Sequence, residues 1–252
     1  GADLSNADLA GANLIAAALD AANLTGTVLR DVNLANFDLS GAQMAGSDLT
    51  KANLNGAKLA KADLTGANLT QACLETAILR SANLTQAILR EANLRSAQLS
   101  LAIMTSADMS RADLTGANCS KVNWTRAILE HAVLHSANMT GAILREVNLS
   151  GARLTAAQMS GCDLAKAELV GSRLTRANLQ NAILHSANLD GAVLDSATLN
   201  GATLVEANLS RAVLTSAQLP GADLTRANLA AADLSRCNLA SANLTAAILQ
   251  GA

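Results

Sequence analysis

The chain has almost no aromatic side chains: its 252 residues include one Phe, one Trp and no Tyr, and there is a single Pro. It also lacks a run of Lys and Arg, so nothing in it resembles the basic grooves and stacking rings that bind nucleic acids. No apolar run approaches the roughly 20 residues of a transmembrane helix, and no signal-peptide pattern opens the chain. These absences favour a soluble protein without membrane insertion and without a nucleic-acid partner.

What the chain does have is an unbroken five-residue repeat. Leu fills 43 of the 50 positions 4, 9, 14 and so on to 249, here called the centre position, and Ala fills 41 of the small positions two residues earlier. The outward position between them is Asn or Asp in 27 units, and two turn positions follow, the second of which holds all 16 glycines. Such alternation is typical of a strand, and the three-residue step to the next small position requires a corner. The repeat predicts a polygonal coil with Leu and Ala inside and the charges outside.

The charges indicate how many sides the polygon has. Residues stacked on successive coils lie about 4.8 Å apart, so opposite charges should recur one coil apart. At a spacing of 20 residues there are seven opposite-charge pairs, such as Asp38 with Lys58, and one like-charge pair, Arg153 with Arg173. Spacings of 15 and 25 give only three and one opposite pairs. Four pentapeptides per coil are therefore predicted.

The unit Ala-Asp-Leu-Thr-Gly at 62–66 resembles the repeat of the pentapeptide repeat family, and the resemblance covers the whole chain. It implies an all-β fold, a right-handed quadrilateral β-helix solenoid of about 12 coils with four pentapeptides each. We expect residues 1–252 to form one uninterrupted domain without a helix. Its structural core should include Leu64, Leu134, Trp124 and Phe37.

Histidine and cysteine show no catalytic or metal-binding pattern in this register. His131 and His135 have a spacing that binds zinc on a helix, but a pentapeptide coil places them on different sides. Three of the four cysteines are inward, where a thiol is usually a core residue. No nucleophile lies beside a base and a carboxylate, and no phosphate-binding loop is present. We expect a protein that is not an enzyme and that has no catalytic residue, metal or cofactor.

The least regular stretch runs from about residue 100 to 125. Trp124 replaces a centre Leu, and Cys119 is interpreted as compensation for its volume. Leu101 is the only Leu of 44 outside the centre position, and Ile103 is outward. With Ile78 and Ile88 about one coil away, these two residues are either ordinary surface variation or an exposed apolar contact patch. Such patches often mark a binding surface. The patch in question is Ile78, Ile88, Leu101 and Ile103.

Two functions remain. The first is a non-catalytic structural scaffold for protein–protein interaction with an unidentified partner. The alternative resembles the quinolone-resistance branch of the family, a DNA mimic that modulates DNA gyrase or topoisomerase. Duplex DNA as long as the predicted rod would carry about 35 negative charges, whereas this chain has 20 acidic residues against 18 basic ones. The charge balance favours the scaffold.

The termini bear on whether the rods associate, and the glycosylation sequons bear on where in the cell the protein is located. Both ends of the chain are in register with the repeat and lack the polar caps that solenoid ends need. This indicates either an excised, engineered or cleaved segment or end-to-end self-association of rods. Four Asn-Leu-Thr sequons would carry sugars on a eukaryotic secretory route. A bacterial cytoplasm is therefore the expected location.

Overall fold

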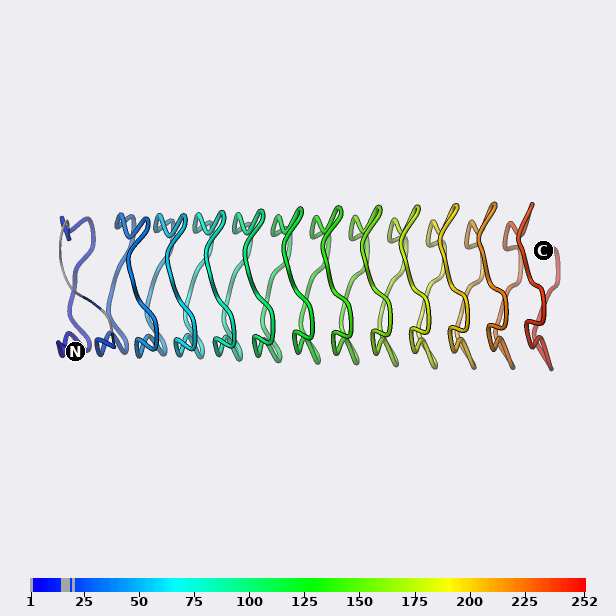
Figure 1. Cartoon of the computed structure of the whole chain (residues 1–252), viewed down its shortest axis with the longest axis horizontal. Helices are drawn as coiled ribbons and strands as arrows, with labels where there is room; N and C mark the ends of the chain where they lie inside the picture. The colour runs from blue at the N-terminus through cyan, green and yellow to red at the C-terminus, as the bar shows by residue number, and fades with distance from the viewer. Residues whose placement is uncertain (1, 15–18, 20) are drawn as a thin grey trace.

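Short extended segments and tight turns wind into a rod in the computed structural model, which describes residues 2–14, 19 and 21–252. The coils follow one another along a single axis, with the two termini at opposite ends (Figure 1). From Asn23 to Asn228, each described outward residue forms a parallel bridge with the outward residue 20 positions later, as Asp63 does with Asn83. One coil is therefore four pentapeptides, as the charge spacing predicted. In the described part no residue is helical, so no helix there could cross a membrane.

Four ladders of bridges run along the rod, one on each side, and we number the sides after them. Ladder 1 runs from Asp3 to Asn243 and ladder 2 from Asp8 to Ile248. Ladder 3 runs from Asn33 to Asp233 and ladder 4 from Asp38 to Asn238. The chain visits the sides in this order, so side 1 lies opposite side 3 and side 2 opposite side 4. The part of the predicted solenoid that falls on residues 15–18 and 20 lies outside the described residues.

A tight turn forms each corner. The N–H of the small residue donates to the C=O of the centre residue three positions earlier, as Ala222 does to Leu219 at 3.0 Å. The second turn residue has a positive φ in every described unit, which is the requirement of a type II turn. Gly221 meets this requirement without strain, whereas Leu101 holds a φ of 63° at a cost of roughly 1 kcal/mol.

Backbone hydrogen bonding explains why Asn and Asp dominate the outward position. In the pentapeptides from residue 42 to 231 the N–H groups of the outward, centre and second turn residues donate to neighbouring coils, and the small residue's N–H closes the corner. The N–H of the first turn residue has no backbone acceptor. An outward Asn or Asp accepts it, as Asp63 Oδ1 accepts from Thr65 N–H at 3.0 Å. This Asx turn, which the repeat pattern alone did not predict, completes the pairing of all five donors.

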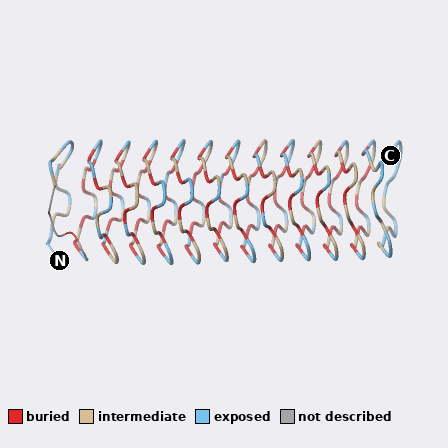
Figure 2. Cartoon of the chain, turned by 45° about the horizontal axis from the view of Figure 1, so that its top comes forward, coloured by how far each residue is buried: buried red, intermediate tan, exposed pale blue. Residues whose placement is uncertain are grey.

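The core is the column of small and centre residues inside the coil. Buried residues recur from coil to coil along the rod (Figure 2). Leu64, Leu134 and Trp124 are fully buried, as expected. Phe37 is only partly buried, although it packs against this core. Position 17, one coil before Phe37, lies outside the described residues.

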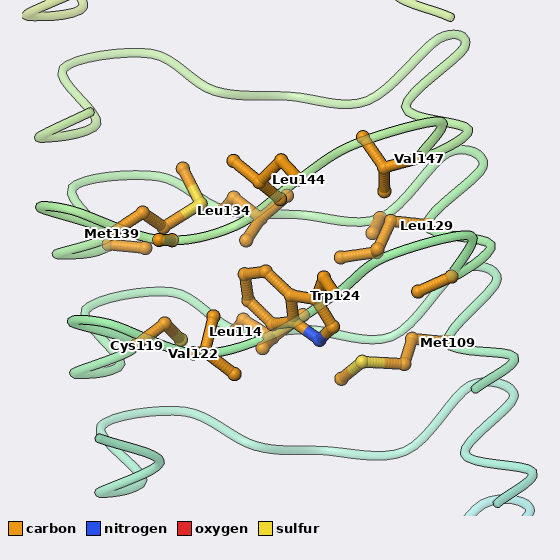
Figure 3. Close-up of a cluster of buried hydrophobic side chains, with 14 of the residues drawn as sticks. Met109, Leu114, Cys119, Val122, Trp124, Leu129, Leu134, Met139, Leu144 and Val147 are labelled. Carbon is orange, nitrogen blue, oxygen red and sulfur yellow. The ribbon is translucent and has the colours of Figure 1, made fainter. Parts of the chain in front are cut away.

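Trp124 is the largest departure from the repeat inside the rod. Figure 3 shows its ring projecting into the coil among the centre side chains, with Met109 and Cys119 nearby in place of Leu. All three are fully buried, so the smaller thiol and the flexible thioether accommodate the indole. The indole Nε1 has no hydrogen-bond partner. An unpaired buried donor costs about 1–3 kcal/mol.

Candidate functional site

The buried thiols are poor candidates for chemistry. Burial raises the pKa of Cys119 far above its ordinary value and raises the pKa of Cys162 to about 12. Both groups are therefore protonated at neutral pH, whereas a nucleophilic cysteine must be a thiolate. Across the residues that the structure describes, no three His, Cys, Asp or Glu side chains gather in an arrangement that would hold a metal ion.

The four residues of the predicted patch lie on three sides of the rod. Ile103 is on ladder 1, Ile88 on ladder 2 and Ile78 on ladder 4, and sides 2 and 4 face away from each other. Leu101 occupies the corner that leads from side 4 to side 1. Leu101 and Ile103 are 51% and 47% exposed and lie two residues apart, whereas Ile78 is half-buried. The structure thus brings Leu101 and Ile103 together and separates Ile78 from Ile88.

Side 1 carries a more regular apolar feature, which we call the aliphatic row: Ile103, Ile143 and Ile183. These residues are 47%, 41% and 43% exposed, and they recur on ladder 1 every 40 residues, which is every second coil. Their separation along the rod is therefore about 10 Å. The 40-residue spacing is visible in the sequence, but the predicted patch was confined to residues 78–103 and did not include Ile143 and Ile183.

Charged residues accompany the row on the same side. Asp163, on ladder 1 between Ile143 and Ile183, accepts a hydrogen bond from Arg145 Nε at 2.5 Å. A shallow hollow of about 370 Å³ adjoins Ile183 and is lined also by Arg145, Glu146, Asp163, Ala165, Lys166 and His185. Side 1 thus combines exposed aliphatic groups with fixed charges of both signs, a combination suited to contact with another protein surface.

Seven of the nine ion pairs among the described residues follow two spacings, and the other two are Arg211–Asp190 and His131–Glu130. Three of the seven pairs predicted at a spacing of 20 residues form, among them Lys58 with Asp38 at 3.4 Å. Four others join an Arg at the first turn position to an Asp 18 residues later, because the long side chain reaches diagonally to the next coil. The four are Arg30–Asp48, Arg90–Asp108, Arg95–Asp113 and Arg145–Asp163.

Asp108 shows what such a pair does to a carboxylate. It accepts Arg90 Nε at 2.6 Å, Ser110 Oγ at 2.6 Å and Ser110 N–H at 3.0 Å. Partial burial alone would raise the pKa of Asp108, but the hydrogen bonds from Ser110 and Arg90 outweigh it. The pKa of Asp108 is therefore lowered, and the group is ionised at neutral pH.

A coil of four bridged ladders, with one small and one centre residue inside each unit, defines a β-solenoid built of pentapeptides. The family model described as pentapeptide repeats matches the chain at residues 1–41, 27–66, 38–75, 67–105, 77–116, 112–151, 157–195, 192–229 and 222–252. The protein belongs to the pentapeptide repeat family.

Solved structures of other pentapeptide repeat proteins are similar to the chain. HetL of the cyanobacterium Nostoc, involved in heterocyst differentiation regulation, is 32% identical, with a TM-score of 0.47 over 88% of this chain and 92% of HetL. QnrB1, a plasmid-mediated fluoroquinolone resistance protein, is 20% identical, with a TM-score of 0.46 over 68% of this chain and 85% of QnrB1. Rfr23 of Cyanothece is 36% identical, with a TM-score of 0.24 over 38% of this chain and 58% of Rfr23. None of the curated proteins matches the chain.

Proposed function

We propose that the protein is a non-catalytic scaffold that binds a protein partner through side 1. The observation that carries this proposal is the aliphatic row, three isoleucines that remain 41–47% exposed on one side at a constant spacing. Water contact with aliphatic surface is unfavourable by roughly 25 cal/mol per Å², so a partner that covers the row gains binding energy. The charges beside Ile183 would orient that partner.

We infer further that residues 1–252 act as one domain in a right-handed solenoid, which is the handedness that the family resemblance implies. At 20 residues per coil, 252 residues correspond to about 12 coils. All four cysteines are free, and two of them are fully buried, which suits a reducing compartment such as the cytoplasm.

The test replaces the row by the residue that the repeat prefers: Ile103→Asn, Ile143→Asn and Ile183→Asn together. Each Asn would accept the free N–H of the first turn residue, so the fold should be preserved and its circular dichroism unchanged. We expect capture of the partner from the source cell, quantified by mass spectrometry, to fall at least tenfold. The matched control is Val133→Asn, Val193→Asn and Val213→Asn on side 3, which should capture normally. Unchanged capture by the side 1 variant, or an equal loss in the control, would refute the proposal.

A gyrase supercoiling assay separates the scaffold from the DNA-mimic alternative. The chain's 20 acidic residues are nearly balanced by 18 basic ones, so it lacks the charge density of a duplex. We expect no inhibition at micromolar protein. Clear inhibition would replace the scaffold proposal by the alternative.

A further inference from the structure

Two bridged pairs of outward residues in the described ladders carry charge on both members. On side 4, Asp38 and Lys58 have opposite charges and form an ion pair at 3.4 Å. On side 3, Arg153 and Arg173 carry like charges. Both are exposed, and neither has an ion-pair partner among the described residues. Like charges directly opposite each other on neighbouring strands are destabilising, and an anion bound between them would remove that repulsion.

The same two units also leave hydrogen-bond donors free. Where the outward residue is Asp, its carboxylate can accept hydrogen bonds from a Thr at the first turn position, two residues later. Asp63 Oδ1 accepts one from Thr65 N–H at 3.0 Å and one from Thr65 Oγ1 at 2.6 Å. At positions 153 and 173 the carboxylate is replaced by a guanidinium, which cannot accept a hydrogen bond. The N–H and hydroxyl groups of Thr155 and Thr175 consequently have no acceptor within the described chain, and both residues are partly exposed.

Neighbouring charges do not neutralise this site. None of the four acidic residues from position 146 to 190 is on ladder 3, and each is engaged by another residue: Glu146 by Arg126, Asp163 by Arg145, Glu168 by Asn188 and Asp190 by Arg211. On side 3 itself the next coil contributes one acid, Asp195, which accepts a hydrogen bond from Ser196. Arg176, at the corner that follows Thr175, adds a third exposed cation. The local charge is therefore positive on a chain whose net charge is −2.

We propose that Arg153, Arg173, Thr155 and Thr175 form a binding site for an oxyanion, the phosphate or carboxylate group of a ligand. Its oxygens accept hydrogen bonds from the free N–H and hydroxyl groups of Thr155 and Thr175, and the two guanidinium groups, on coils about 4.8 Å apart, supply the opposing charge. Rigid backbone on both coils holds the threonine donors in place before the ligand arrives. Side 3 lies opposite the aliphatic row, so this site is independent of the proposed scaffold function.

The test titrates isotopically labelled protein with inorganic phosphate and, separately, with glutarate, using sodium chloride at equal ionic strength as the reference. NMR would follow the amide signals of Thr155 and Thr175 and the Nε–H signals of Arg153 and Arg173. We expect saturable shifts confined to these residues, and the anion that saturates at the lower concentration identifies the ligand class. If neither anion shifts them beyond the effect of chloride, the site does not exist.

Arg173→Asp is the decisive variant, because the new carboxylate would accept from Thr175 and pair with Arg153, as Asp38 pairs with Lys58. The variant should weaken anion binding roughly 10- to 100-fold, because it removes at least one charge-assisted hydrogen bond to the anion. Its melting temperature should equal or exceed that of the wild type. A loss of binding therefore cannot be ascribed to unfolding. The control variant is Lys61→Asp, at the corner between sides 4 and 1, which changes the net charge by the same amount. Its affinity for the anion should stay within twofold of the wild-type value. Equal weakening by both variants would show a general charge effect and overturn the proposal.

Discussion

The inside and the outside of the coil obey different constraints. Inside, the centre position is Leu in 43 of 50 units, whereas the outward ladders contain Asn, Asp, Ile, Val, Arg, Lys, Gln and other residues. An inward side chain must fill a cross-section that is the same in every coil, because close packing tolerates neither voids nor excess volume. An outward side chain is placed by hydrogen bonds of the backbone that do not depend on its identity. The interior therefore specifies the fold, and the exterior is free to specify what the rod binds.

The strongest test of this contrast removes volume inside. Leu134→Ala deletes a fully buried centre side chain in mid-rod and should lower the free energy of unfolding by about 2–5 kcal/mol. The matched outward change, Ile143→Asn, should alter it by no more than about 0.5 kcal/mol. Denaturant titration of both variants measures the difference. Similar losses from the two would contradict the division between inside and outside.

Variants of Trp124 distinguish the effect of side-chain volume on stability from the effect of hydrogen bonding inside the rod. Trp124→Ala should cost about 3–5 kcal/mol, because it leaves a large cavity. Trp124→Phe should cost less than about 1 kcal/mol, since the smaller ring also eliminates the unpaired Nε1 donor. Thermal unfolding of the two variants gives the comparison, and a Phe variant as unstable as the Ala variant would show that the indole N–H is paired in solution.

An outward residue should matter where its side chain completes the backbone pairing. Asp108→Ala removes the acceptor of Ser110 N–H, Ser110 Oγ and Arg90 Nε, and should cost about 1–2 kcal/mol. The contribution should also depend on pH. Because the pKa of Asp108 is lower in the folded chain than its ordinary value near 3.8, its stabilisation is complete above that value and is lost as the pH falls below it. Comparing the stability of the wild type and Asp108→Ala at pH 7 and pH 3 would reveal whether the difference narrows as the pH falls toward the lowered pKa of the folded chain.

The smallest expected effect is a gain in stability. Ser172 occupies a small position where most units have Ala, and its buried Oγ has no hydrogen-bond partner. Ser172→Ala should therefore raise the free energy of unfolding by roughly 0.5–1 kcal/mol. By contrast, the buried hydroxyl of Ser47 donates to Met44 C=O at 2.8 Å, so Ser47→Ala should give no gain. A destabilised Ser172→Ala variant would mean that a water or an alternative rotamer satisfies the hydroxyl.

The architecture was largely predictable because the repeat is strict and its charges report the coil length. The pairing of Asp38 with Lys58 is a direct consequence of four units per coil. The diagonal pairs such as Arg90–Asp108 were not predicted, because counting charges at 20 residues considers only vertical neighbours. The predicted contact patch also grouped residues that are close in the chain but lie on different sides of the rod. Ile78 and Ile88 are ten residues apart, which is half a coil, and therefore lie on opposite sides.

The direction of the hydrogen bonds between coils has a mechanical consequence. These bonds link each coil only to the coils before and after it, and the termini lie at the two ends of the rod (Figure 1). A force applied to the termini would load the coils in series and peel them from an end one at a time. Each coil of 20 residues would extend by roughly 60–70 Å on release, its contour length less its rise. The protein should therefore behave under tension as a molecular spring that yields in equal steps.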